Sequence, residues 1–314
     1  MVLAGILLGY ATTVALLGGV VLRRIQWVSR YPRLGVWSWL AAFLSVFVAM
    51  AMAGLLMVTA DLAHLVATGT FGSSAHLAAV TAQTACMVVL IVAVVGSTAG
   101  AGAVAKSFRQ MRRDSDQHLS RIRIASRFDP ELGTLVVASD GLAAYSIAGS
   151  SPSIVLTEGV IATLSENELS AVVAHEVEHL RGRHAFKLAA ASGLRRTFKF
   201  VPLFRTGHDQ LVDLLEMVAD DQAARTCGRR NVASAVLRIA EARSPQFAMS
   251  ASSGNVGIRV RRLMQPEPRL GLIRAAFGVM VLSTVVAFPA VGLVSSAAAA
   301  GPNVTCATTA AHSH

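Results

Sequence analysis

Charged residues are scarce in this chain of 314 residues, where they make up 15% of the sequence. A soluble globular domain usually contains about a quarter. Hydrophobic residues make up 54% of the chain, and its mean hydropathy is +0.56. These values exclude an ordinary soluble domain and predict a membrane protein.

Lys and Arg are missing from residues 59–81, and residues 296–314 carry no charge of either sign apart from histidine. Loops on the cytosolic side of a membrane are rich in Lys and Arg, whereas outer loops are not. We therefore expect both stretches to lie outside. Only three cysteines are present, and they say little about the fold. Cys227 is expected to be a reduced, buried thiol.

Four apolar stretches have the length of about 20 residues that a helix needs to cross a bilayer. They cover residues 1–22, 36–58, 82–105 and 272–295. The first has no basic segment before it, so it is predicted to be a retained span rather than a cleaved signal peptide. A half-buried helix within residues 59–81 stays open as an alternative.

The basic residues fix the predicted orientation. They cluster after the first and third spans, at Arg23, Arg24, Arg30, Arg33, Lys106, Arg109, Arg112 and Arg113. The positive-inside rule places the N-terminus outside, residues 106–271 in the cytosol and the short tail 296–314 outside. We thus predict a multi-pass protein of the cell membrane. The net charge of +10 is explained by basic clusters that face anionic lipid headgroups, so no direct binding of nucleic acid is predicted.

Cys86 and Cys306 fall on the predicted outer side of the membrane. They share an oxidising compartment and could form a disulfide, or they are two unrelated thiols.

The predicted cytosolic segment 106–271 is of mixed α and β character. Residues 106–125 continue the third span as a helix. The runs "TLVVAS", "LAAYSIAG" and "SIVLTE" predict a small antiparallel sheet. Ser165 and Glu168 form a capping box, so a helix should begin near residue 166 and end at Gly182. Further helices are expected over residues 184–198, 208–228, 231–243 and 255–264.

The predicted helix from residue 166 carries "HEVEH", with His175 and His179 four residues apart. Residues at this spacing share a helix face, so both imidazoles can bind one metal ion. Zn²⁺ accepts histidine ligands and keeps an open position for water when three protein ligands are present. Glu176 lies beside that face, where it suits a general base. The alternative is a pair of surface histidines.

A third ligand must come from another part of the chain. In "DLLEMVADD", Asp213, Glu216 and Asp220 share one helix face. Glu216 lies within an apolar run, and a buried carboxylate is normally paired or bound to metal. We expect Glu216 to be the ligand and Asp220 to hold the other N–H of a ligand histidine. A solvated acidic face is the alternative. His184 is expected at the surface, with a supporting role beside the metal as the less favoured reading.

The motifs "HEVEHLRGRH" and "LLEMVADDQAAR", with "PSIVLTEGVIATLSENELSAVVA" before them, resemble the BlaR/MecR-type family of membrane metallopeptidases. This family is related to the gluzincins. The resemblance implies three spans before a cytosolic zinc peptidase domain and one span after it, over residues 1–295. It implies one zinc ion held by His175, His179 and Glu216, with Glu176 as the base and Asp220 in support.

The resemblance also implies a substrate-binding edge strand before the metal helix, in an extended peptide-binding mode. In this chain that strand would contain Ser153, Ile154, Val155 and Leu156.

The chain departs from the antibiotic-sensing members of that family. No large outer domain and no Ser-x-x-Lys motif follows the fourth predicted span, so sensing of β-lactams by an acylated serine is not supported. The expected function is regulated cleavage of a cytosolic protein, with a transcriptional repressor and the chain itself as candidate substrates. The alternatives are a housekeeping peptidase for membrane proteins and a signalling scaffold with a residual metal site. Membrane lipid is an expected partner, and a homo-oligomer stays open.

Overall fold

The computed structural model describes residues 2–25, 30–68, 75–243 and 251–266. The predicted fourth span 272–295 and the tail 296–314 lie outside these ranges. The proposed pairing of Cys86 with Cys306 also falls outside what the structure describes.

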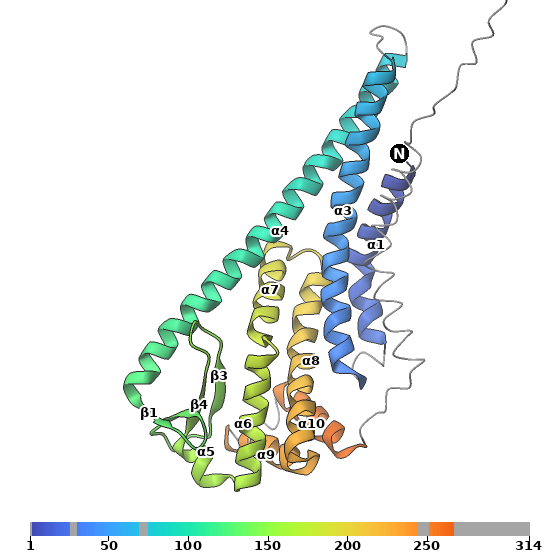
Figure 1. Cartoon of the computed structure of the whole chain (residues 1–314). Coiled ribbons are helices and arrows are strands. Elements are labelled where there is room, and N and C mark those ends of the chain that lie inside the picture. The colour runs from blue at the N-terminus through green and yellow to red at the C-terminus, as the bar shows by residue number, and fades with distance from the viewer. Residues whose placement is uncertain (1, 26–29, 69–74, 244–250, 267–314) are drawn as a thin grey trace, which may run out of the picture.

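Three long helices with apolar stretches account for the described part of residues 2–125 up to the sheet. They are α1 (Val2–Arg24), α3 (Pro32–Thr68) and α4 (Ala75–Ala125). Each contains a stretch long and apolar enough to cross a membrane, which fits a membrane protein. In Figure 1 the upper part of α4 runs beside α3, and its lower part diverges toward the sheet. As predicted, the helix of the third candidate span continues to residue 125.

A four-stranded sheet follows α4, in the order β1-β2-β4-β3. Its strands are β1 (Ser126–Asp129), β2 (Thr134–Val137), β3 (Ala144–Ile147) and β4 (Ser153–Thr157). β2 and β4 pair in parallel, whereas the other neighbours are antiparallel. The prediction of a purely antiparallel sheet is therefore wrong. The chain leaves β2, forms the outer strand β3 and returns between the two as β4.

The prediction that residues 153–156 form a substrate-binding edge strand is also wrong. Ser153, Ile154, Val155 and Leu156 belong to β4, which has ladder partners on both sides. This strand takes an inner place because its apolar side chains are buried: Val155 and Leu156 are fully inaccessible. Within the described sheet, the edge beside the helix that carries His175 and His179 is β3, whose backbone is paired on one side only.

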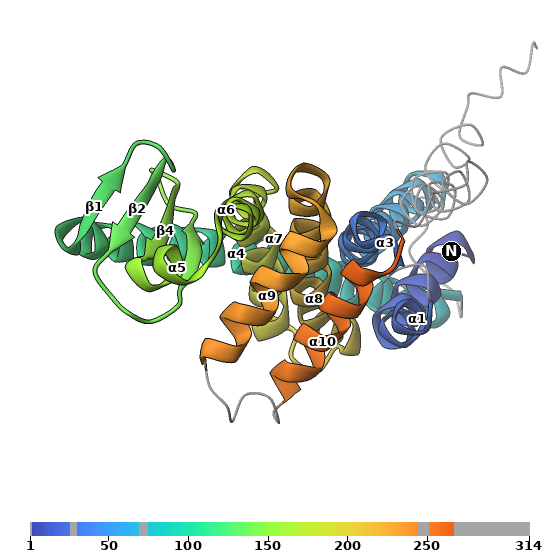
Figure 2. The same ribbon diagram turned by 90° about the horizontal axis from the view of Figure 1, so that it is seen from below.

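In the described part of the chain, six helices follow the sheet. They are α5 (Glu158–Thr163), α6 (Glu166–Arg181), α7 (His184–Thr197), α8 (Pro202–Cys227), α9 (Arg229–Arg243) and α10 (Ala251–Met264). Seen from below, α6 lies between the sheet on one side and α8 with α9 on the other (Figure 2).

The start and the end of α6 confirm the sequence prediction. The Ser165 hydroxyl accepts the backbone N–H of Glu168, and the Glu168 carboxylate accepts the backbone N–H of Ser165. This reciprocal pair satisfies N–H groups that a helix start leaves unpaired. The helix ends with Gly182 as its C-cap.

Helix α8 begins at Pro202, earlier than the predicted start near His208. Proline suits the first turn of a helix because it has no N–H to lose there. The added turns carry Leu203 and Phe204 into the protein interior.

The helical hairpin of α7 and α8 shares its core with the apolar helices. Trp39 and Phe43 of α3 pack in one buried cluster with Leu203, Phe204 and Leu211 of α8. The rings of Phe43 and Phe204 lie 5.3 Å apart, in a tilted arrangement. The segment predicted as a cytosolic domain is thus joined to the candidate spans by apolar packing along α8.

Gly207 allows the close approach of α8 to α3, because a Cβ at this position would overlap the rings of Phe43 and Trp39. We expect Gly207→Val to destabilise the protein by about 1–3 kcal/mol, as overpacking of a core does. The measurement is the thermal unfolding midpoint of the full chain in detergent. Gly257→Val is the matched control, since a Cβ there meets open space. Equal midpoints for the two variants would contradict the close packing.

Candidate metal centre

The three predicted metal ligands meet where α6 crosses α8. The Nε2 atoms of His175 and His179 lie 3.1 Å apart. Glu216 of α8 reaches both rings: its Oε1 lies 3.4 Å from Nε2 of His179, and its Oε2 lies 3.6 Å from Nε2 of His175. Helix α6 supplies the histidine pair by its own periodicity, and α8 supplies the carboxylate by packing against it.

These separations fit a tetrahedral zinc ion. Zinc binds nitrogen and oxygen ligands at about 2.0–2.1 Å, so two ligands at a tetrahedral angle lie about 3.4 Å apart. The three side chains together offer ligand atoms within 4.8 Å of one another. Two imidazoles and one carboxylate are also a donor set that catalytic zinc sites use. The residues present therefore fit the metal that the sequence predicts.

Asp220 lies behind His175, on the side away from the ligand nitrogen. Its Oδ1 is 3.1 Å from Nδ1 of His175, close but without the alignment of a hydrogen bond. Asp220 is fully buried, with 1% of its surface exposed. It thus has the place that the sequence predicts, beside the second nitrogen of a ligand histidine, where a carboxylate fixes the orientation of the ring.

Arg259 of α10 is the residue that the sequence reasoning missed. Its Nε and Nη2 donate to the two oxygens of Asp220, both at 2.7 Å, and its Nη1 lies 2.9 Å from Oε2 of Glu216. The sequence contains two adjacent acids, Asp220 and Asp221, and two arginines one helical turn apart, Arg259 and Arg262. In the structure each arginine pairs with one of the acids. The packing of α10 against α8 could not be inferred from the residues alone.

The charges of the centre depend on one another. Burial alone would lower the pKa of His175, but Asp220 and Glu216 outweigh it and raise this pKa to about 9. Burial would raise the pKa of Glu216, yet His175 and Arg259 lower it to about 2. Burial and the neighbouring His175 lower the pKa of His179. In the protein without metal, Glu216 is therefore a carboxylate, the His175 ring is protonated and the His179 ring is neutral.

Glu176 is half-buried on α6 beside the two ligand histidines. Its charge acts on both His179 and Arg259. Among the residues that the structure describes, its carboxylate makes no hydrogen bond or ion pair. It is therefore free to exchange a proton with a molecule in the centre, as a general base requires.

His184 is not a surface residue, contrary to the favoured prediction. It is 1% exposed, and its Nδ1 lies 3.0 Å from Nδ1 of His179. Burial, followed by the charges of His179 and Lys187, lowers its pKa to about 3. A neutral His184 can accept the Nδ1–H of His179 and so fix the tautomer that leaves Nε2 for the metal.

Two polar residues of α8, Asp213 and His208, lie away from the centre. Asp213 accepts a hydrogen bond of 2.6 Å from the amide of Asn255. His208 lies beside Asp209 and Arg195, at 3.2 Å and 3.1 Å. Neither belongs to the candidate ligand cluster.

Loss of Arg259 should weaken the metal centre. In Arg259→Gln, Asp220 and Glu216 lose their shared cation, so their positions relative to His175 relax. Changes of this supporting kind reduce metal affinity about 10–100-fold, and a competitive titration with a zinc chelator measures it. Arg262→Gln is the control, because Arg262 pairs with Asp221 outside the centre. Equal zinc affinity in wild type and Arg259→Gln would contradict the role of Arg259.

Zinc affinity should rise with pH up to about pH 9. The pKa of His175 is raised to about 9, so this ring is protonated at neutral pH and must lose a proton to become a ligand. The proton competes with the metal below pH 9 and no longer competes above it. Isothermal titration in buffers of different ionisation enthalpy measures the proton released at pH 7.5. Zinc binding without proton release would show that His175 is neutral in the metal-free protein.

Comparison with known families gives a match over the region that holds this centre. The family model described as Peptidase family M48 matches residues 119–264, from the end of α4 to the end of α10. No match is found among curated proteins or among solved structures. Peptidases of this family are generally zinc-dependent. The match and the fit of the ligand triad together support a metallopeptidase function for the chain.

Proposed function

We propose that this protein is a membrane-embedded, zinc-dependent endopeptidase whose centre faces the cytosol. The observation that carries the proposal is the meeting of His175, His179 and Glu216 at separations suited to one zinc ion. The M48 match over the same residues supports it. A bound zinc ion would supply Lewis acidity and make water a nucleophile near neutral pH.

The side chains around the centre have separate tasks in this proposal. Glu176 takes a proton from the attacking water and returns it to the amine nitrogen that leaves. Arg259 holds Asp220 through two hydrogen bonds and Glu216 through one close contact. His184 orients His179, and Asp220 orients His175. The chain thereby holds its ligands in place before substrate arrives.

Strand β3 is the surface that we propose for the substrate backbone. It is the sheet edge that packs beside α6, and the described residues leave one side of its backbone unpaired. An extended peptide can add to such an edge through main-chain hydrogen bonds. Cleavage would then depend on an extended stretch of substrate more than on one side chain.

The cellular role follows from the membrane arrangement that the basic residues predict. With residues 106–271 in the cytosol, the substrate is a cytosolic protein or the cytosolic part of a membrane protein. The BlaR/MecR-type resemblance favours regulated cleavage of one target, such as a repressor. A housekeeping peptidase would cleave many membrane proteins. A non-catalytic scaffold is less favoured, because a structural metal site does not need a general base such as the unpaired Glu176.

Glu176→Gln should keep the metal but lower the rate of cleavage about 10²–10⁴-fold, the usual contribution of a general base. His175→Ala should lose both metal and cleavage. Glu166→Gln is the control, since it makes the same change on an exposed turn of the same helix. The measurement combines zinc content with mapping of new protein N-termini in cells that express each form.

A single new N-terminus in a repressor, absent from Glu176→Gln cells, would identify a regulator. Many scattered N-termini would identify the housekeeping role. Wild-type cleavage by Glu176→Gln would refute the proposed mechanism.

A further inference from the structure

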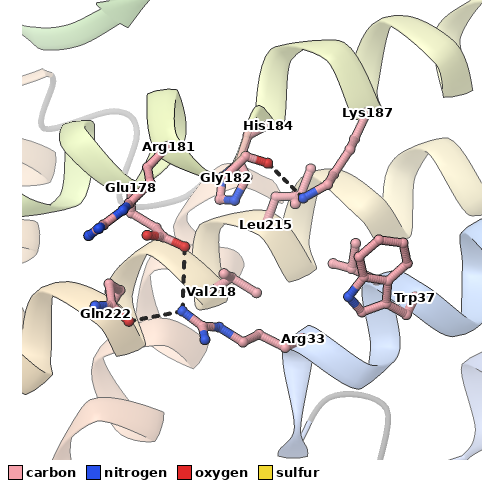
Figure 3. Close-up of a pocket in the computed structure, with 11 residues that line it drawn as sticks. Arg33, Trp37, Glu178, Arg181, Gly182, His184, Lys187, Leu215, Val218 and Gln222 are labelled. Atoms are coloured by element: carbon pink, nitrogen blue, oxygen red, sulfur yellow. Dashed lines mark hydrogen bonds and ion pairs between the residues drawn. The ribbon is translucent and has the colours of Figure 1, made fainter. Parts of the chain in front are cut away.

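A cavity of about 420 Å³ lies next to the candidate metal centre but is not part of it. His184 separates the two, because it lines the cavity while its Nδ1 contacts His179. The turn from α6 to α7 forms one wall, α8 forms another, and the start of α3 forms a third (Figure 3). The metal ligands do not line it, and the peptidase mechanism gives it no task.

The cavity is lined by three basic side chains, Arg33, Arg181 and Lys187, and by one acidic side chain, Glu178. A binding site for a cation would have the opposite balance. Figure 3 shows the Lys187 ammonium at the α6–α7 turn, on the side of Trp37, and the Arg33 guanidinium turned toward Glu178 and Gln222. The lining thus favours an anion.

Lys187 and Arg33 both have N–H groups that are not used in hydrogen bonds. The Lys187 ammonium donates once, to the backbone oxygen of Gly182 at 2.7 Å, and has three N–H groups. Arg33 uses only Nη2, which donates to Gln222 at 2.9 Å and lies 3.5 Å from Glu178. Within the described residues, its Nε and Nη1 make no further hydrogen bond or ion pair. Phosphate oxygens accept this kind of converging charged donor.

Lys187 lies in surroundings that disfavour its charge. Burial lowers the pKa of Lys187, and the nearby Arg33 lowers it further, against the opposite effect of Glu178. Its ammonium lies over the Trp37 ring, at 5.9 Å from the centroid. An anion between Lys187 and Arg33 would offset the repulsion between the two cations.

The cavity also lies at the depth of lipid headgroups. The candidate span of α3 runs from Pro32 to Thr59 over 28 residues. At 1.5 Å per residue that is about 42 Å, more than the ~30 Å of hydrocarbon in a bilayer. Arg33 and Trp37 belong to its first turns, and Trp37 is 56% exposed. Exposed tryptophan and arginine at the end of a span are typical of the interface with the headgroups.

We propose that this cavity binds a phosphate group between Arg33 and Lys187, supplied either by the headgroup of an anionic phospholipid or by free phosphate. Basic pockets beside membrane helices are known to bind anionic headgroups. The site is independent of the proposed peptidase activity, because its binding can be measured without zinc or cleavage.

Native mass spectrometry of the full chain in a neutral maltoside detergent tests the site. The probes are phosphatidylglycerol and phosphatidylcholine with the same acyl chains, with inorganic phosphate as a third arm read by the thermal unfolding midpoint. We expect phosphatidylglycerol to bind at least about tenfold more tightly than phosphatidylcholine, and the double variant Arg33→Gln/Lys187→Gln to lose this preference. The control is Arg24→Gln/Arg113→Gln, which removes the same charge from exposed residues outside the cavity.

Loss of phosphatidylglycerol binding in the cavity variant alone supports a lipid headgroup. A midpoint raised by inorganic phosphate in wild type but not in the cavity variant, without lipid preference, supports free phosphate. Wild-type binding by the cavity variant, or equal loss in the control, overturns the proposal. If the double variant does not unfold cooperatively, Lys187→Gln alone should weaken binding about fivefold, and unchanged binding in it overturns the proposal as well.

Discussion

The candidate metal centre depends on one largely buried ion-pair network, in which Arg259 holds Asp220 and Glu216 of α8. Two carboxylates inside a protein repel each other and lose their hydration, so they are stable there only with compensating charge. Arg259 lies within 2.7 Å of one and 2.9 Å of the other. Burial alone would lower the pKa of Arg259, but its acidic partners raise it, so the guanidinium stays charged. The network ties α10 to α8 and leaves Glu216 directed at the histidines of α6.

Helix α8 connects this centre to the candidate membrane spans. Its first turns pack against α1 and α3 through Leu203, Phe204 and Leu211, and its middle turns carry Glu216 and Asp220. Leu215, the neighbour of Glu216 in the chain, belongs to the same buried cluster as Trp39 and Phe43 of α3. The cavity proposed to bind phosphate lies on the same contact between α3, α8 and the α6–α7 turn.

The local features of the site were predictable from the sequence because they depend on neighbours in the chain. The capping box of Ser165, the shared face of His175 and His179, and the stop at Gly182 all follow from helical periodicity and hydrogen bonding. The place of Asp220 followed from the spacing to Glu216.

Features that depend on contacts between distant segments were not predictable. The continuous apolar run of β4 from Ile154 to Leu156 fits an inner strand, but it does not say which strands flank it, so the insertion between β2 and β3 was not predictable. The burial of His184 results from the packing of α7 against α6, and the role of Arg259 results from the placement of α10. Each of these three features depends on how a distant helix or strand packs, and a local sequence motif does not contain that information.

The most direct test of the central claim is X-ray absorption at the zinc edge of the purified full chain, together with its metal content. We predict one zinc per chain, bound only by nitrogen and oxygen at about 2.0–2.1 Å, with the scattering signature of two imidazoles. A protein that binds no zinc, or a zinc ion with sulfur ligands or without imidazole, would contradict the meeting of His175, His179 and Glu216 at one ion.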